Sequence, residues 1–135
     1  MDDRNFDQKT AQDWIKTIEG NDSVREKDIY PRLQSWIDSV SPSNILEIGA
    51  GQGACSSRII LNNKLYTGVD PSPFLVDRAK QLYLSQDRHF ALGNAYALPF
   101  PDETFDAAFS VSVWHLLSDL QKAAFELSRV LVKNG

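Results

Sequence analysis

A short apolar run that breaks into alternate glycines constrains this chain more than any other feature. Residues 45–53 read Ile-Leu-Glu-Ile-Gly-Ala-Gly-Gln-Gly, which places glycine at Gly49, Gly51 and Gly53. Such a run predicts a buried strand that turns sharply into a helix, here expected over residues 53–62. Glycine accepts positive φ and lets a ligand approach the backbone without meeting a Cβ atom. The helix start adds unsatisfied N–H groups and a positive dipole end. The segment therefore predicts a ligand-binding bend.

The rest of the chain alternates between predicted strands and predicted helices. Strands are expected over residues 44–48, 64–69, 88–92 and 105–111, and a last helix over residues 119–132. Ser72 and Pro73 are typical of a helix start, and this helix is expected to turn four apolar side chains inward: Phe74, Leu75, Ala79 and Leu82. Strands separated by helices of this length favour an α/β fold with a parallel sheet. Ligands of such sheets bind at the carboxyl ends of the strands.

The first forty residues have the periodicity of two helices. One apolar face is formed by Ala11, Trp14, Ile15 and Ile18, and a second by Ile29, Leu33, Trp36, Ile37 and Val40. We therefore expect an N-terminal helical cap over residues 1–43 and a ligand-binding domain over residues 44–135.

The charge of the chain excludes some classes of partner. The 135 residues carry a formal net charge of −4 and contain no block of Lys and Arg, which argues against nucleic acid and against an anionic membrane surface. No apolar run approaches the roughly 20 residues of a membrane span. Cys55 is the one cysteine of the sequence, so no internal disulfide forms and a cytoplasmic location is expected. We expect Cys55 to be a small buried packing residue. No metal site is expected.

The glycine bend has two interpretations from its residues alone. Residues 49–54 satisfy the dinucleotide fingerprint Gly-x-Gly-x-x-(Gly/Ala), and Asp70 lies near the expected distance downstream, so an NAD-binding oxidoreductase domain is one alternative. Two features weigh against it. Glu47 places a carboxylate two residues before the first glycine, where it repels a pyrophosphate and attracts a cationic group. In addition, residues 93–106 have no role in an NAD fingerprint.

Five segments, taken in order, resemble the class I S-adenosylmethionine-dependent methyltransferases, in particular the "type 11" small-molecule group. The matching segments are residues 45–53, 69–72, 93–100, 105–112 and 129–135. The resemblance implies a Rossmann-like, doubly wound parallel sheet of about four strands in the order 3-2-1-4, with S-adenosylmethionine as cofactor. It also implies a small molecule as methyl acceptor.

The resemblance further assigns roles to individual residues. Glu47 and the backbone of Gly49, Ala50, Gly51 and Gly53 are expected to hold the methionine end of the cofactor. Asp70, followed by Pro71, is expected to accept from the ribose hydroxyls. Asn94 and Ala95 are expected at the adenine edge, with Asn94 standing where the family more commonly has Asp. The main chain of Ser110 is expected to line the methionine pocket, and His115 is a candidate general base. Structural roles stay open: Glu47 as a helix cap, Asp70 as a turn residue and His115 as a packing residue.

In the family, a segment like residues 129–135 precedes a fifth strand. The resemblance therefore implies a domain truncated before strand 5, with the fourth strand at the edge of the sheet. We expect this edge to pair with a second copy, as a homodimer, or to be covered by another segment. A non-catalytic module that binds S-adenosylmethionine or S-adenosylhomocysteine is a further alternative.

Overall fold

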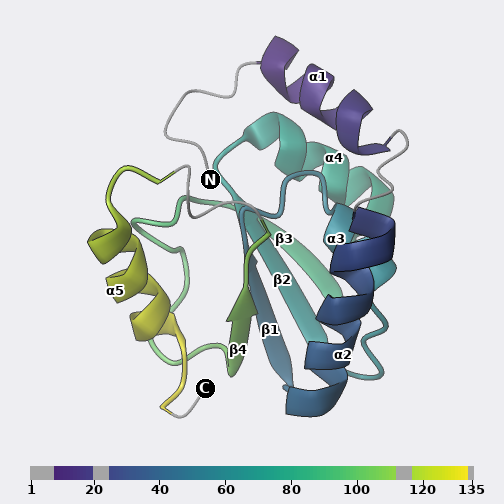
Figure 1. Cartoon of the computed structure of the whole chain (residues 1–135). Coiled ribbons are helices and arrows are strands. Elements are labelled where there is room, and N and C mark those ends of the chain that lie inside the picture. Colours follow the sequence, from purple (N-terminus) through teal and green to yellow (C-terminus); the bar gives the residue numbers. More distant parts are fainter. Residues whose placement is uncertain (1–7, 20–24, 112–116, 134–135) are drawn as a thin grey trace.

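A parallel sheet of four strands forms the centre of the computed structural model, which describes residues 8–19, 25–111 and 117–133 (Figure 1). The strands are β1 (Asn44–Ile48), β2 (Leu65–Asp70), β3 (Arg88–Leu92) and β4 (Ala107–Phe109). Their order is β3-β2-β1-β4, and every pair is parallel. This confirms the predicted α/β class and strand order.

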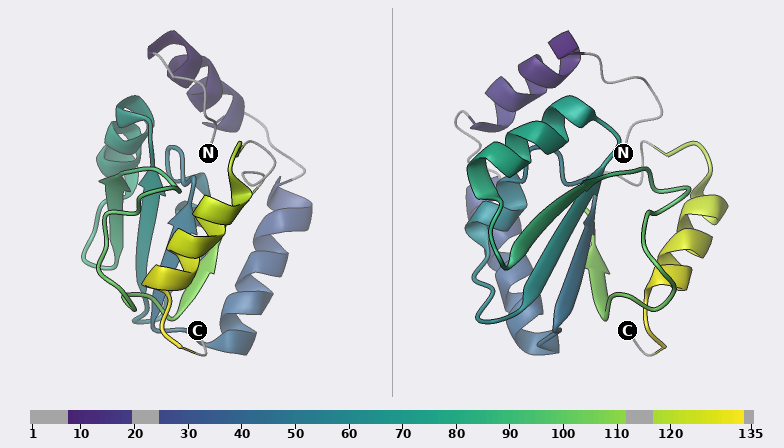
Figure 2. Two further views of the ribbon diagram at one scale, coloured as in Figure 1. Left: turned by 90° about the vertical axis from the view of Figure 1, so that its left-hand side faces the viewer. Right: turned by 180° about the vertical axis from the view of Figure 1, so that it is seen from behind.

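Helices cover both faces of the sheet (Figures 1 and 2). On one face, α2 (Tyr30–Val40), α3 (Ala54–Arg58) and α4 (Pro73–Tyr83) contribute to a core with Ile45, Tyr66 and Phe90. On the other face, α5 (Leu120–Val130) packs on Leu46, Ile48 and Val69. The helix α1 (Gln8–Glu19) lies beside α4, and a π-helical turn, η1 (Arg25–Ile29), leads directly into α2. No helix of these ranges is long and apolar enough to cross a membrane.

The predicted helix starts are confirmed by their caps. The Ser72 hydroxyl accepts from the N–H of Leu75, with Pro73 in the first turn of α4. The Asp119 carboxylate accepts from the N–H of Lys122 at the start of α5. These caps satisfy N–H groups that have no partner within the helix.

Several predicted boundaries and faces were wrong. The helix expected over residues 53–62 ends at Arg58, because Ile59 is extended and the Arg88 guanidinium takes the carbonyls of Ser56 and Ile59. The last helix ends at Val130. In α4, Leu75 and Ala79 are buried as expected, but Phe74 is 39% and Leu82 is 42% exposed.

Phe74 is exposed because of the position of the buried stripe. Val76, rather than Phe74, faces the sheet together with Leu75 and Ala79. At 100° per residue, Phe74 lies on the opposite side of the helix. In α2, Leu33 and Ile37 are buried while Val40, at the end of the helix, is exposed.

The fourth strand is shorter than the predicted range 105–111. Phe105 is paired instead with the chain after α5: its N–H donates to the Val130 carbonyl, and its carbonyl accepts from Val132. The Asp106 carboxylate accepts from the N–H groups of Ser43 and Asn44. Regular pairing of β4 with β1 is therefore limited to Ala107–Phe109.

Candidate functional site

The glycine bend joins β1 to α3 at the carboxyl ends of the strands. Gly49, Gly51 and Gly53 all have positive φ, between 58° and 85°. The N–H groups of Gly49 and Ala50 both donate to the Val69 carbonyl, at 2.8 and 3.1 Å, which fixes the bend to the end of β2. A side chain at any of the three glycines would be strained. The predicted bend is confirmed, and its backbone is bare at the place where ligands of such sheets bind.

Asp70 ties this bend to the next helix. It ends β2 and is 7% exposed, with one carboxylate oxygen accepting from Gly51 N and the other from Ser72 N, each at 3.0 Å. Burial raises the pKa of Asp70, and the two N–H donors oppose that shift. Each carboxylate oxygen keeps a further lone pair for a ligand donor. Pro71, which follows, is exposed.

Glu47 lies behind the bend with its carboxylate out of solvent. The residue is 2% exposed, and the Tyr66 hydroxyl donates to its Oε1 at 2.6 Å. Burial raises the pKa of Glu47 from 4.5 to about 7, against the opposing effects of hydrogen bonds from Tyr66 and Cys55 and of the positive charge of Arg25. Since these hydrogen bonds come from side chains, nothing in the described contacts supports a helix-capping role for Glu47. It is a buried acid, able to accept from a cation.

The Tyr66 side chain reaches Glu47 on the neighbouring strand because the residue directly opposite Glu47, Gly68, has no side chain. Register pairs Glu47 with Gly68, so Tyr66 is the diagonal neighbour. A Cβ on Gly68 would lie 2.7 Å from the Tyr66 hydroxyl oxygen and 2.6 Å from the Ala50 Cβ. The bare position at Gly68 therefore makes room for both the hydrogen bond and the bend.

Cys55, the second residue of α3, lies next to this acid and is buried, as the sequence predicts. Burial and the charge of Glu47 raise the pKa of its thiol, so the thiol stays protonated at neutral pH. It is therefore a poor nucleophile here.

Gln52 also belongs to the bend, although sequence reasoning gave it no role. The residue is 2% exposed, and its Nε2 atom has no hydrogen-bond partner within the described part of the chain. A buried amide that lacks a partner costs free energy unless another group satisfies it. Its position between two left-handed glycines is the signal that would have marked it.

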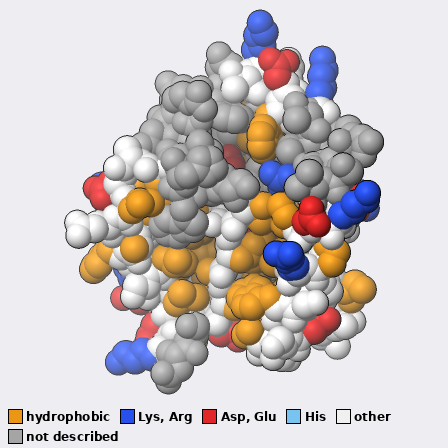
Figure 3. All heavy atoms as spheres, viewed as in Figure 1, with side chains coloured by type: hydrophobic (Ala, Val, Ile, Leu, Met, Phe, Trp, Pro, Cys, Tyr) orange, Lys and Arg blue, Asp and Glu red, His pale blue; other side chains and the backbone are white. Residues whose placement is uncertain are grey.

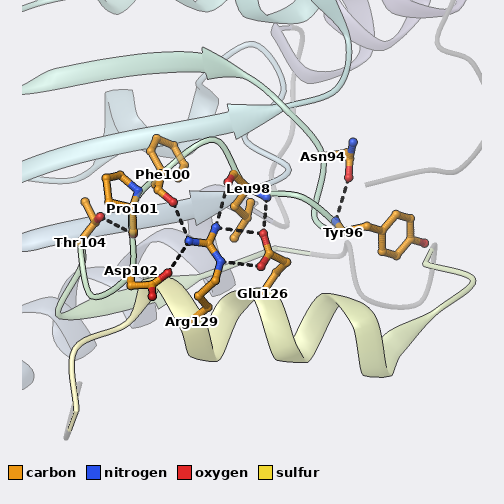
Figure 4. Close-up of polar contacts among 9 residues, drawn as sticks. All are labelled: Asn94, Tyr96, Leu98, Phe100, Pro101, Asp102, Thr104, Glu126 and Arg129. Carbon is orange, nitrogen blue, oxygen red and sulfur yellow. Dashed lines mark hydrogen bonds and ion pairs between the residues drawn. The ribbon is translucent and has the colours of Figure 1, made fainter.

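The loop after β3 brings Asn94 and Ala95 to the same edge. The N–H of Gly93 donates to the Asp70 carbonyl at 3.0 Å, which joins the ends of β3 and β2. Ala95 is buried, while Asn94 is exposed. Asn94 Oδ1 accepts from Tyr96 N at 2.9 Å, within its own turn (Figure 4), and this oxygen keeps a second lone pair.

An ion-pair network fastens the continuation of this loop to α5 (Figure 4). The Arg129 guanidinium donates to both Glu126 oxygens, to Asp102 and to the carbonyls of Leu98 and Phe100. Glu126 in turn accepts from Leu98 N at 2.8 Å. The planar, five-donor fork of arginine suits this arrangement, and lysine has no equivalent.

We expect Arg129→Lys to loosen this loop. The single nitrogen of lysine cannot serve the four partners of the guanidinium together, so amide hydrogen exchange of residues 98–104 should become roughly tenfold faster or more. Gln121→Ala, on the exposed side of the same helix, should leave that exchange unchanged. Equal exchange in the Arg129→Lys variant and the original protein would contradict the anchoring role.

Ser110 lies beyond β4 and lines a hollow of about 70 Å³ together with Ile48, Ala108, Phe109 and Leu127. Hydrophobic side chains gather on this side of the molecule, between α5 and α2 (Figure 3). Phe109 packs edge-on against Trp36, with ring centroids 6.2 Å apart. His115, the candidate general base, lies outside the described residues.

The structure thus brings together the predicted residues of the bend, Glu47 and Asp70, with Asn94 and Ala95 at the adjoining strand end. Sequence reasoning missed Tyr66, Gln52 and Arg25. No pattern near Tyr66 or Arg25 in the sequence marks them. The register between β1 and β2 brings Tyr66 to Glu47, and the fold of the N-terminal segment brings Arg25 there.

Comparison with known proteins finds methyltransferases. The family described as "Methyltransferase domain" matches residues 46–135. A malonyl-[acyl-carrier protein] O-methyltransferase of Serratia marcescens is 32% identical over 110 residues, which are 82% of this chain and 42% of that protein. A 2-methyl-6-phytyl-1,4-hydroquinone methyltransferase of Synechocystis sp. is 34% identical over 121 residues, 84% of this chain and 38% of that protein. The chain therefore spans less than half the length of these two relatives.

A solved structure also matches the fold of this chain. The YcgJ protein of Bacillus subtilis superposes with a TM-score of 0.63 at 31% identity, over 73% of this chain and 45% of that one.

Proposed function

The chain belongs to the class I S-adenosylmethionine-dependent methyltransferases, and from that premise we propose that its glycine bend binds S-adenosylmethionine for methyl transfer to a small molecule. The observation that carries the proposal is the buried Glu47 carboxylate directly behind a bare, left-handed bend. A carboxylate there attracts the ammonium of an amino acid and repels a pyrophosphate. Both this position and the family weaken the NAD-binding alternative.

The residues present fit such a cofactor in three respects. Gly51 leaves its backbone bare, Glu47 supplies a buried acceptor for a cation, and Gln52 holds a buried donor that lacks a described partner. We assign the methionine end to Glu47 and to the backbone of residues 49–53, and the ribose hydroxyls to Asp70, with Pro71 beside it. The remaining assignments are the adenine edge to Asn94 and Ala95 and the lining of the methionine pocket to Ser110.

When bound, S-adenosylmethionine supplies a methyl group attached to positively charged sulfur. This chain's own residues contribute by positioning the cofactor. We propose that Asp70 holds the ribose end and that the bend holds the methionine end. Burial of Glu47 keeps water from competing for its charge. We keep His115 as the proposed group that accepts a proton from an acceptor nucleophile. Residues 1–43 are proposed as a helical cap over the domain of residues 44–135.

The acceptor is proposed to be a small molecule, whose identity neither the bend nor Asp70 specifies. The relatives' names refer to a malonyl group on a carrier protein and to a hydroquinone, which are themselves different acceptors. The net charge of −4 argues against a nucleic-acid acceptor.

Calorimetric titration with S-adenosylhomocysteine and with NAD tests the proposal. We expect binding of S-adenosylhomocysteine and none of NAD at the same concentrations. Binding of NAD alone would overturn the methyltransferase assignment. Binding of S-adenosylhomocysteine without any methyl transfer, tested over a panel of acceptors, would favour the non-catalytic module.

The sheet edge at β4 is the proposed site of homodimer formation. Among the described strands, β4 pairs with β1 alone and stands at the edge of the sheet, next to the apolar hollow at Ser110. The chain at residues 130–132 pairs with Phe105, just before this strand. Light scattering should give twice the mass of the chain. Asp substitution at Phe109 should then restore the monomer, and a monomeric parent protein would contradict the proposal.

A further inference from the structure

A tyrosine in the turn after β3 reaches the start of α5. The turn of residues 94–97 carries the two residues that we assign to the adenine edge, and Tyr96 follows them directly. The Tyr96 hydroxyl accepts from the N–H of Ser118 at 3.0 Å and lies 3.3 Å from the Ser118 hydroxyl oxygen. Figure 4 shows its side chain extended toward the beginning of α5. Tyr96 therefore joins the turn to the residue that precedes the Asp119 cap.

Packing supports this connection. Ala95 and Leu117 are buried in the same hydrophobic cluster, and the Tyr96 side chain packs against it. The Lys122 ammonium lies over the Tyr96 ring, 5.9 Å from its centroid, within the range of a cation–π contact. The ring is thus held by the protein itself rather than left to stack on a bound base.

The connection links segments that follow opposite edges of the sheet. Among the four described strands, β3 lies at one edge and β4 at the other. Tyr96 belongs to the chain after β3, while Ser118 and Lys122 come after β4. The position of the turn therefore depends on α5 as well as on its own strand.

Other contacts hold the two ends of the turn. On one side the N–H of Gly93 donates to the Asp70 carbonyl at 3.0 Å, and on the other Glu126 accepts from the N–H of Leu98 at 2.8 Å. Tyr96 lies between these two points. Without its hydroxyl, the turn would stay attached at both ends while its middle could shift.

A turn that recognises the edge of a base needs a fixed position, because hydrogen bonds weaken steeply when their geometry changes. We propose that Tyr96 is a positioning residue: by fastening the turn of residues 94–97 to the start of α5, it sets how strictly the site distinguishes adenine from other purines. The inference rests on the proposed function, because it concerns the adenine edge of the same site. By thermodynamic linkage, a base bound at the turn should also stabilise the start of α5.

Two ligands that differ in one group of the base test this role. S-Adenosylhomocysteine carries an exocyclic amino group on its purine, and S-inosylhomocysteine carries an oxygen in its place. In calorimetry, we expect the parent protein to bind S-adenosylhomocysteine roughly tenfold or more tightly than S-inosylhomocysteine. Tyr96→Phe keeps the ring and removes the hydroxyl. Its affinity for S-adenosylhomocysteine should fall roughly three- to tenfold, while its affinity for S-inosylhomocysteine should stay the same.

Amide hydrogen exchange gives a second measurement, at the other end of the contact. Binding of S-adenosylhomocysteine to the parent protein should slow the exchange of residues 117–122 by roughly fivefold. Tyr96→Phe should lose this slowing. Ser128→Ala removes a hydroxyl from an exposed position of the same helix, and this matched control should leave both the selectivity and the slowing unchanged.

An equal fall in affinity for both ligands in Tyr96→Phe would overturn the inference, because it would mean that the tyrosine only supports the fold. Unchanged affinities, or a slowing of exchange that persists in the variant, would overturn it as well. So would a parent protein that binds the two ligands equally. If the parent protein binds neither ligand, the proposed function itself fails.

Discussion

Replacing Asp70 with alanine is expected to weaken the binding of S-adenosylhomocysteine by about 100-fold or more. Two hydrogen bonds from ribose hydroxyls to an ionised carboxylate contribute roughly 1.5–3 kcal/mol each. The substitution has a second effect in the free protein, because the Asp70 oxygens hold Gly51 N and Ser72 N at 3.0 Å. Loss of both acceptors loosens the bend and the start of α4, so the melting temperature should also fall.

Calorimetric titration gives the change in affinity, and thermal unfolding followed by circular dichroism gives the change in stability. Asp77→Ala removes a carboxylate from the exposed side of α4 and should alter neither. Asp70→Asn keeps one acceptor oxygen, so its affinity for S-adenosylhomocysteine should lie between those of the parent protein and Asp70→Ala. An Asp70→Ala protein that unfolds at a lower temperature but binds as before would restrict Asp70 to a turn-forming role.

The bend, Asp70 and the caps could be predicted because their signals are local. Positive φ at alternate glycines, an acid at the end of a β-run and Ser72 before Pro73 all depend on neighbours along the chain. The strand order followed from the family resemblance. Each of these features is fixed by residues within a few positions of one another, or by a pattern shared with a whole family.

The rest depends on contacts between distant parts of the chain. Tyr66 meets Glu47 only because the register of β1 and β2 pairs Glu47 with Gly68. The apolar pattern of a strand does not determine which residues of the neighbouring strand lie opposite it. α3 ends early because Arg88, thirty residues later, takes its last carbonyls. Asn94 Oδ1 accepts from Tyr96 N because a short polar side chain in a turn readily bonds the backbone two residues on, and the sequence alone does not show which turn forms.

We expect the charge of Glu47 to change stability and cofactor binding in opposite directions. Burial raises the pKa of Glu47 from 4.5 to about 7, so between these pH values the folded protein holds a proton that the unfolded chain has released. The free energy of unfolding therefore decreases as pH rises through this range, by roughly 3 kcal/mol in total from this one group. The stabilising contribution is complete below about pH 4.5 and is lost above about pH 7.

Glu47→Gln imitates the protonated acid and keeps an oxygen for the Tyr66 hydroxyl. At pH 8 the free variant should be more stable than the parent protein by up to roughly 3 kcal/mol, and at pH 4.5 the two should be equal. Urea unfolding at both pH values measures this difference, and other titrating groups, such as Asp70, cancel in the comparison. A variant that is less stable at pH 8 would show that Glu47 is ionised in the folded protein and stabilised by its neighbours.

Binding should change in the opposite sense, because an ammonium needs the ionised carboxylate. For the parent protein, the affinity for S-adenosylhomocysteine should rise about tenfold from pH 6 to pH 8, as the fraction of ionised Glu47 increases. Glu47→Gln should abolish this pH dependence and lower the affinity at pH 8 by roughly 10- to 100-fold. Calorimetry at pH 6, 7 and 8 in buffers of different ionisation enthalpy would also detect the proton released on binding. Gain of stability with loss of binding in one variant is the result expected of a residue whose charge serves the ligand. Unchanged affinity in the variant would remove Glu47 from the site.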